Sequence, residues 1–196
     1  MTPSDDLTVR LATAGDVAGI VDLESRYYVD NLDASARAKG FISVLHSPRW
    51  FAATVDSGGM HVAVTADEEI AGFIAVTDPP TRTEAGLSPI VRAMLDLAET
   101  VEMNGKPIAV QRWALRGPVC IDEAFRGRGI YASFNAVTGE FYRHRYDIGV
   151  VFVAADNPRS LHTTTTKLDA RSLAEFEVDS KRFHFLAFDF GESDQP

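Results

Sequence analysis

The spacing of apolar and polar positions predicts alternating short strands and amphipathic helices in the first half of the chain. Residues 8–12 alternate as a strand, and after Thr13 the apolar positions recur at the helical spacing of three and four. A second helical stretch is predicted over residues 33–45. A short helix is predicted to begin at Pro48 and to end at the glycines of residues 58–59.

Two strands follow, and then a connection that is long for a compact domain. Residues 61–65 and 70–77 are rich in apolar and β-branched side chains and flank an acidic turn, as strands of a hairpin do. Residues 81–107 are longer than most loops, and their apolar stripe predicts an extra helix. Three interpretations of this helix stay open: it forms a lid, it makes a dimer contact, or it buries its apolar stripe in the core.

The remaining pattern completes a mixed fold. The predicted elements are a long strand over residues 108–121, bent or bulged at Gly117-Pro118, a helix over 130–141, a buried strand over 149–155, a helix over 158–168, and two strands within 173–190 that turn at 179–180. The elements lack a regular βαβ rhythm, and no linker separates them. The prediction is one α/β domain of the α+β type over residues 1–196, with an extra helical segment around 81–107.

Composition and charge narrow the partners. The net charge of −9 disfavours nucleic acid and mildly favours a cationic acceptor, although an acidic surface more often serves solubility. The single cysteine, Cys120, cannot form an internal disulfide. Residues 1–6 are polar and lack the apolar core of a signal peptide, and the apolar runs are too short to span a bilayer. We therefore predict a cytoplasmic protein without membrane or nucleic-acid partners.

The most informative segment is a glycine loop between a predicted strand and a predicted helix. It contains two arginines and two glycines: Arg126, Gly127, Arg128 and Gly129. Glycines let the backbone approach a ligand closely, and a helix N-terminus attracts anions, so the segment suits a diphosphate. A tight connection with two solvated arginines is the alternative. Ala132 stands where a Rossmann fingerprint needs its third glycine, and the Gly-Lys-Ser/Thr end of a Walker A loop is missing.

Residues 121–130, with Arg126 and Gly129 in place, resemble the acetyl-CoA loop of GNAT N-acetyltransferases. Tyr131 departs from that pattern, because it is bulky where the family is small. The resemblance extends to the opening strand and helix, to residues 69–76 with Gly72, and to a later motif with Asn157, Ser160 and Lys167-Leu168, and so covers most of the chain except residues 81–107. It implies a mostly antiparallel central sheet with splayed strands, flanked by helices.

The resemblance also implies a function and a set of binding residues. The chain would be an N-acyltransferase that moves an acetyl group from acetyl-CoA to an unidentified small-molecule or peptide amine, by direct attack in a ternary complex. The pantetheine arm would lie between the splayed strands of residues 114–121 and 149–155, with the thioester near a backbone N–H of residues 119–121. The implied CoA-binding residues are Val119, Ile121, Arg126, Gly127, Arg128, Gly129, Ile130, Tyr131 and Asn157.

The catalytic residues stay unassigned. Direct attack needs a base, and the strand over residues 108–119 has no Asp, Glu or His. Weak candidates lie elsewhere: Asp122, Glu123, Glu84 and residues 27–30, each more often a solvated group. Where family members place a tyrosine acid, this chain has Thr165. The alternative is therefore a non-catalytic module of the same fold that senses acyl-CoA.

Other chemistry-bearing residues favour structural roles. Cys120 has no adjacent base, and the five histidines lack metal-ligand spacing, so we predict a buried thiol and no metal. Tyr27, Tyr28 and Trp113 could form an acceptor pocket, but core packing is the default for aromatic residues. Asn157 before Pro158 is also a good helix N-cap. A homodimer through the extra helix stays open.

Overall fold

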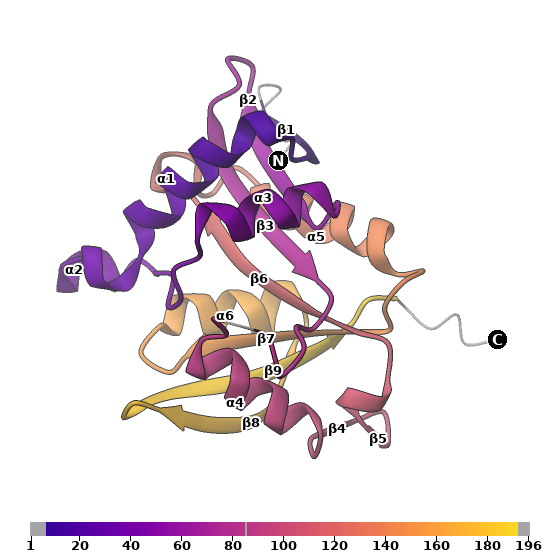
Figure 1. Cartoon of the computed structure of the whole chain (residues 1–196). Coiled ribbons are helices and arrows are strands. Elements are labelled where there is room, and N and C mark those ends of the chain that lie inside the picture. Colours follow the sequence, from indigo (N-terminus) through magenta and orange to yellow (C-terminus); the bar gives the residue numbers. More distant parts are fainter. Residues whose placement is uncertain (1–6, 85, 192–196) are drawn as a thin grey trace. The chain divides into compact units, whose positions relative to one another are not determined.

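The computed structural model describes residues 7–84 and 86–191 (Figure 1). Residues 1–6, for which the sequence predicts no signal-peptide core, lie outside the described residues. The chain divides into two compact units, one formed by residues 1–77 and 116–138 and the other by 78–115 and 139–196. The order of the hydrogen-bonded strands is β1-β2-β3-β6-β7-β9-β8, and strand β6 (Trp113–Ile121) contributes residues to both units.

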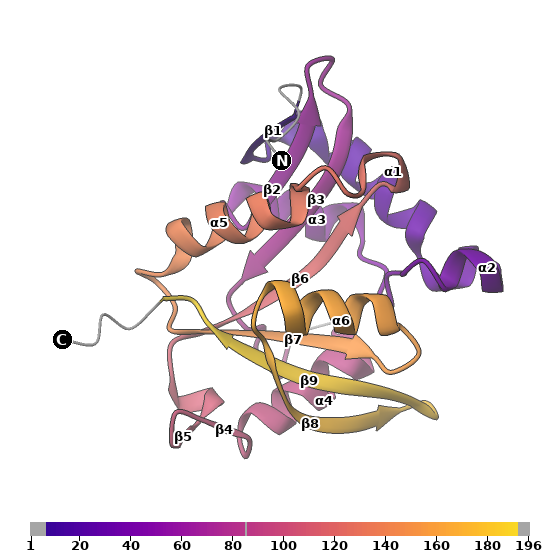
Figure 2. The same cartoon turned by 180° about the vertical axis from the view of Figure 1, so that it is seen from behind.

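The first unit is built on antiparallel strands with helices on both faces. Strands β1 (Leu7–Leu11), β2 (Met60–Thr65) and β3 (Ile70–Thr77) pair in chain order, which confirms the predicted hairpin. Helices α1 (Val17–Tyr27) and α3 (Pro48–Asp56) cover one face, and α5 (Ile130–Tyr142) covers the other (Figures 1 and 2).

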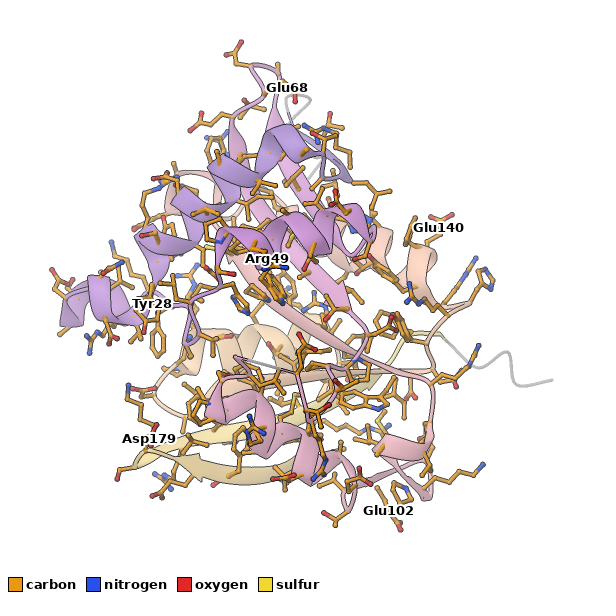
Figure 3. All side chains as sticks on the ribbon, in the orientation of Figure 1. Tyr28, Arg49, Glu68, Glu102, Glu140 and Asp179 are labelled. Carbon is orange, nitrogen blue, oxygen red and sulfur yellow. The ribbon has the colours of Figure 1, made fainter. Side chains whose placement is uncertain are left out.

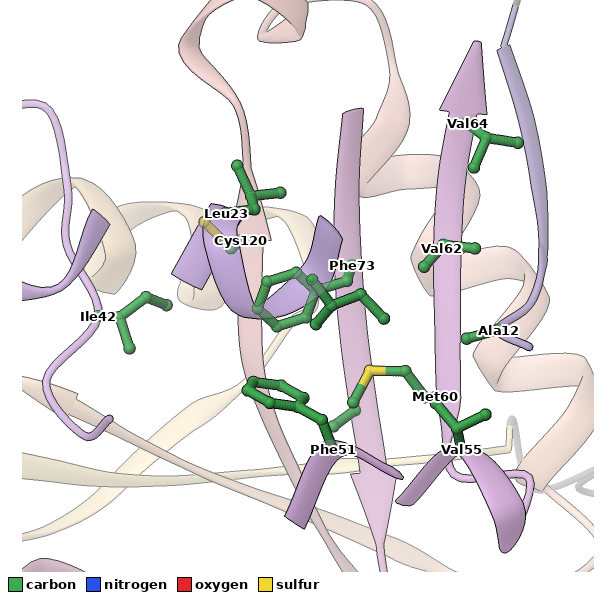
Figure 4. Packing of buried hydrophobic residues seen from close by; sticks show 12 residues of the cluster. Ala12, Leu23, Ile42, Phe51, Val55, Met60, Val62, Val64, Phe73 and Cys120 are labelled. Carbon is green, nitrogen blue, oxygen red and sulfur yellow. The ribbon is translucent and has the colours of Figure 1, made fainter. Parts of the chain in front are cut away.

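Each face of this sheet has its own apolar core. The core under α1 and α3 includes Leu23, Phe51, Phe73 and Cys120, which lie side by side in Figure 4. The core under α5 includes Ile130 and Phe134. Because strand side chains alternate between faces, the β2 and β3 residues are shared between the two cores, and both strands are buried almost throughout.

The prediction of a helix over residues 33–45 was wrong beyond its first turn. Asp33 caps α2 by accepting from the Ala36 N–H, but α2 ends at Arg37 (Ala34–Arg37). Ile42 instead pairs with the chain just after α1: its N–H donates to the Tyr27 carbonyl (2.8 Å), and its carbonyl accepts from the Val29 N–H (3.0 Å). These long-range backbone bonds outweigh the local helical preference, and Gly40 at φ +98° turns the chain toward them.

The second unit holds an antiparallel sheet with one helix on each face. Strand β7 (Ile148–Ala154) pairs with β9 (Lys181–Asp189), which pairs with β8 (Arg171–Val178). Helices α4 (Pro89–Ala98) and α6 (Pro158–Lys167) lie on opposite faces (Figures 1 and 2). Asp179 and Ser180, both at positive φ, form the predicted turn between β8 and β9, and Figure 3 shows Asp179 at its tip.

The extra segment belongs to the core of this unit. The apolar stripe of α4, comprising Val91, Met94, Leu95 and Ala98, is buried with Trp113, Ile148 and Phe185. This burial selects the core among the three interpretations of the segment. A small hairpin follows α4, formed by β4 (Glu102–Met103) and β5 (Lys106–Pro107), which the pattern did not predict.

The predicted strand over residues 108–121 was wrong in its first part. Ile108–Val110 form a 3₁₀ turn, and the strand begins at Trp113. Ile108 is fully buried under α4, and its N–H donates to the Val101 carbonyl, so the apolar residues here fill the core of the inserted segment rather than extend the sheet. The predicted fold class, a mixed α/β chain with a mostly antiparallel sheet flanked by helices, is confirmed.

Candidate functional site

The predicted loop lies where β6 ends and α5 begins, within the first unit. After a 3₁₀ turn at Glu123–Phe125, Gly127 and Gly129 adopt φ of +81° and +86°, the left-handed region that favours glycine. An added Cβ at either position would meet no heavy atom within 4 Å, so open space surrounds this backbone. The loop therefore leads an exposed, glycine-shaped backbone into a helix N-terminus, which carries unsatisfied N–H groups and partial positive charge.

Arg126 shapes the loop. Its Nε donates to the Ile121 carbonyl (3.0 Å), its Nη1 donates to the Lys39 carbonyl (2.9 Å), and its guanidinium lies 5.0 Å from the centre of the Tyr27 ring. These contacts tie the loop to β6 and to the segment after α2. Arg128 is exposed and lies over the Phe125 ring, at 5.2 Å. The two arginines therefore differ: Arg126 is held by backbone carbonyls, and Arg128 faces solvent.

The carboxylates before the loop are held in ion pairs. Asp122 pairs with Arg26 (2.5 Å), and its other oxygen accepts from the Ala124 N–H. Glu123 pairs with Lys39 (2.7 Å). A base must be able to release its cation before it takes a proton, so these pairs weaken both predicted candidates. Tyr27 completes the link between α1 and the loop, because its hydroxyl accepts from the Glu123 N–H (2.6 Å).

The remaining candidates for the base are residues 27–30 and Glu84. Tyr28, labelled in Figure 3, donates its hydroxyl to Asp30 (2.9 Å), and this hydrogen bond raises the pKa of Tyr28. Glu84 is exposed and belongs to the second unit. Trp113 is buried in the core of the second unit, so its default role as a core residue is confirmed.

Val119 and Ile121 pack their side chains against α5. Both are partly buried against the cluster that contains Ile130 and Phe134. Their side chains are therefore engaged on the α5 face, and any contact they make with a ligand must come from the backbone. Cys120, between them, points to the opposite core and is 5% exposed. Burial raises its pKa to about 12, and the predicted buried thiol is confirmed.

Arg116 explains why a tyrosine follows the loop. The side chain of Arg116 is buried on β6, where its Nη2 donates to Asn135 Oδ1 (2.7 Å) and its Nη1 to the Tyr131 hydroxyl (3.4 Å). The guanidinium also lies 5.2 Å from the centre of the Tyr131 ring. Tyr131 is bulkier than the loop pattern expects because its ring and hydroxyl contact the buried guanidinium of Arg116, five residues before the end of β6. Arg116 was not predicted from the sequence, where its one signal is a charge within an apolar strand.

Arg116 also marks a change of face within β6. It contacts α5, as Val119 and Ile121 do, although regular alternation would place residue 116 on the face of residue 120. Between them, Gly117 has φ +136° and precedes Pro118. The predicted irregularity at Gly117-Pro118 is confirmed, and it lets one strand supply α5 with both a buried cation and apolar side chains.

The parallel pairing of β6 with β7 is short. It spans three residue pairs, Trp113–Ile148, Ala114–Gly149 and Leu115–Val150. Strand β6 continues to Ile121 and β7 to Ala154. Beyond Leu115, β6 belongs to the first unit, where the Asp122 N–H just past its end donates to the Ala71 carbonyl of β3 (2.9 Å).

Asn157 and Thr165 lie on α6 in the second unit. Asn157 is 3% exposed and caps the helix, because its side-chain oxygen accepts from the Ser160 N–H, which confirms the predicted N-cap. Thr165 belongs to a run of four threonines, residues 163–166, all of which lie within α6. The Thr165 hydroxyl lies within hydrogen-bonding distance of the Leu161 and His162 carbonyls (3.0 and 3.2 Å), as threonine hydroxyls in helices commonly do.

Comparison with known proteins identifies the fold. Neither a family model nor a curated protein matches the sequence. Solved structures do match: a GNAT-family acetyltransferase of Streptococcus agalactiae (TM-score 0.64, 15% identity, 93% of this chain and 95% of that one) and another of Listeria monocytogenes (0.63, 14%, 96% and 98%). A Salmonella typhimurium protein solved with its cofactor acetyl-CoA also matches (0.60, 14%, 98% and 98%). The chain has the fold of the GNAT acetyltransferases.

Two further features are absent from the described residues. Within residues 7–84 and 86–191, no helix combines the length and apolarity needed to cross a bilayer. In the same residues, no group of three or more His, Cys, Asp or Glu side chains is arranged to hold a metal ion.

Proposed function

We propose that this chain is an N-acetyltransferase that uses acetyl-CoA and transfers the acetyl group to a small-molecule or peptide amine by direct attack in a ternary complex. The observation that carries the proposal is the exposed loop with Gly127 and Gly129 at positive φ, leading into α5, in a chain with the GNAT fold. Acetyl-CoA supplies an activated acyl group as a thioester. The cytoplasmic location and a homodimer stay predictions.

The loop residues fit a pyrophosphate. A diphosphate needs close backbone N–H donors and positive charge, and the open space at both glycines allows that approach. Arg128 adds an exposed cation beside the N-terminus of α5. Arg126 holds the loop in its shape through the Ile121 and Lys39 carbonyls. We assign Val119, Ile121, Ile130, Tyr131 and Asn157 as further CoA-binding residues on the resemblance.

A second candidate function rests on Thr165. The position that holds a tyrosine acid in many family members carries a threonine here, and its hydroxyl lies against the helix carbonyls. A hydroxyl so engaged is a poor proton donor for a departing thiolate. This observation favours a module that binds acyl-CoA without turnover. Both functions require the loop, but only the enzyme releases free CoA when an amine is added.

The first test is thermal unfolding with acetyl-CoA, CoA, ATP or NAD at matched concentration. A ligand that binds only the folded protein stabilises it by about 2.7 kcal/mol at a hundred times its dissociation constant. We expect acetyl-CoA and CoA to raise the midpoint and ATP and NAD to leave it unchanged. An unchanged midpoint with acetyl-CoA would end the assignment. An amine panel that monitors free CoA then separates enzyme from sensor.

Loop variants with a matched control locate the binding. Gly129→Ala puts a Cβ at φ +86° and narrows the approach to the ligand, whereas Gly58→Ala puts a Cβ at φ +71° in equally open space after α3. Both should lose about 1 kcal/mol of intrinsic stability from the left-handed conformation. Only Gly129→Ala should bind acetyl-CoA at least tenfold more weakly, which cuts a stabilisation of about 2.7 to about 1.4 kcal/mol. Equal acetyl-CoA stabilisation in the two variants would move the site elsewhere.

A further inference from the structure

A buried carboxylate lies where α1 should present an apolar side chain. Ile20, Leu23, Glu24 and Tyr27 share one helical face, and Glu24 on this face is completely buried. A carboxylate in such a place must be paired and hydrogen-bonded, because an isolated buried charge is very unfavourable. In the sequence, Glu24 stands out only as a charge within an apolar stripe.

Both oxygens of Glu24 are occupied by His46. The backbone N–H of His46 donates to Oε2 (2.9 Å), and the ring Nδ1 lies 2.6 Å from Oε1. An ionised carboxylate only accepts hydrogen bonds, so Nδ1 carries the proton. In the neutral ring the lone pair is then on Nε2, the arrangement in which a carboxylate orients a histidine for proton transfer.

Aromatic packing fixes the orientation of the His46 ring. The ring centre lies 4.1 Å from that of Trp50 and 5.8 Å from that of Phe51. Phe51 in turn packs edge-on against Phe73 in the core. The His46 side chain keeps 18% of its surface exposed, so the ring is held in place but reachable from solvent.

The pair lies on the same face of the first unit as Cys120. Leu23, next to Glu24 in the chain, and Phe51, whose ring packs against that of His46, belong to one core with Cys120 (Figure 4). Burial chiefly raises the pKa of Cys120, and the nearby Glu24 and Asp122 charges add to the rise while Arg126 and Arg26 oppose it. Glu24 is therefore close to the part of β6, residues 119–121, to which the resemblance assigns the thioester.

We propose that His46 is the base that accepts the proton of the acceptor amine, and that Glu24 is the residue that positions it. This inference rests on the proposed function. The ammonium proton passes to Nε2, and the freed lone pair of nitrogen forms the C–N bond. The C–S bond breaks with its electrons on sulfur, nitrogen's next proton ends on that sulfur, and His46 returns its proton to water. Amide and free CoA result.

Glu24→Gln gives the sharpest test. The amide keeps the size of the carboxylate and an acceptor for the backbone N–H, but its NH₂ group favours the tautomer in which Nε2 carries the proton. We expect unchanged stabilisation by acetyl-CoA and at least a 100-fold lower turnover at pH 7 for both Glu24→Gln and His46→Asn. Glu140→Gln and His144→Asn, at exposed positions of the second unit, are the matched controls and should keep full turnover.

A pH series separates catalysis from structure. The charges that act on Cys120 of β6 are those of Glu24 and Arg26 on α1 and of Asp122 and Arg126 at the loop. The rings that contact His46 are those of Trp50 and Phe51 on α3, a helix that also carries Arg49 and Asp56. The turnover of His46→Asn relative to wild type should recover as the pH rises above the pKa of the acceptor amine, because the free amine needs no base. A purely structural role gives a deficit that is constant with pH.

The outcomes for the wild type and for the variants answer different questions. Wild-type protein that binds acetyl-CoA but releases no CoA with any amine refutes the enzyme, and the base with it. Active wild type together with His46→Asn and Glu24→Gln that keep turnover within threefold refutes the base alone. A loss of turnover that does not change with pH also overturns the proposal. So does a loss of turnover accompanied by an equal loss of stabilisation by acetyl-CoA. Either result means that His46 and Glu24 serve the folded structure and not proton transfer.

Discussion

Replacing Gly149 by alanine should destabilise the second unit, although alanine is normally more favourable than glycine within a strand. Gly149 lies in β7 and pairs directly with Phe188 of β9. The added methyl carbon would lie 2.1 Å from Phe188 Cζ and 2.2 Å from Cε1. Real Cβ atoms do not approach a ring so closely. The ring covers the glycine backbone, is 5% exposed and packs against Phe190, so it has little room to move.

The magnitude follows from two opposed effects. Glycine loses more backbone entropy on folding than alanine, so the substitution by itself contributes about 0.5–1 kcal/mol of stability. Forcing the Phe188 ring out of its place costs about 2–3 kcal/mol, either as lost burial or as strain from overpacking. The net expectation is a loss of about 1–2 kcal/mol in the free energy of unfolding.

The two tryptophans give an assay for each unit. Trp50 lies in the first unit and Trp113 in the core of the second, so a Trp50→Phe background leaves Trp113 as the fluorescence probe of the second unit. With a urea m-value of about 1–1.5 kcal/mol/M, the midpoint should fall by about 1 M. Gly139→Ala is the control, because a methyl there meets nothing within 4 Å. In a helix it should stabilise the protein by up to about 1 kcal/mol.

A second background tests the mechanism. In Phe188→Leu protein the smaller side chain leaves room for the methyl group, so Gly149→Ala should become neutral or stabilising there. If Gly149→Ala is as stable as the parent with Phe188 in place, the ring does not cover the glycine, and strand preference alone explains the result.

Two further predictions concern the first unit. The hydrogen bond from Arg10 lowers the pKa of Asp16 from 3.8 to about 2, so its stabilisation is full above pH 4 and is lost as the pH falls toward 2. Asp16→Asn should lower the free energy of unfolding by about 1 kcal/mol at pH 7 and flatten its dependence on pH between pH 4 and 2. Urea unfolding in a Trp113→Phe background, in which Trp50 is the probe, measures both effects. If the variant and the parent lose stability equally between pH 4 and 2, the Arg10–Asp16 pair is not the cause. Cys120 should react with a thiol reagent only as fast as the protein unfolds, since burial raises its pKa to about 12; rapid labelling of the native protein would contradict this.

The sequence by itself determined the features that depend on neighbours in the chain. The turn at Asp179 and Ser180, the cap at Asn157 and the glycines of the loop follow from conformational preferences within a few residues. The glycine loop was therefore found with its position and boundaries. Strand and helix types were also readable wherever an apolar pattern recorded a buried face, as in the hairpin over residues 61–77.

Tertiary structure decided what depends on partners far along the chain. The helix predicted over residues 33–45 ends early because Ile42 bonds to backbone groups after α1. Tyr131 departs from the loop pattern because it faces Arg116 across a strand-helix contact. His46 becomes chemically distinctive only beside Glu24, twenty-two positions away. Local pattern records the average environment of a residue, whereas hydrogen-bond pairing is set by three-dimensional proximity, and proximity exists only once the chain has folded.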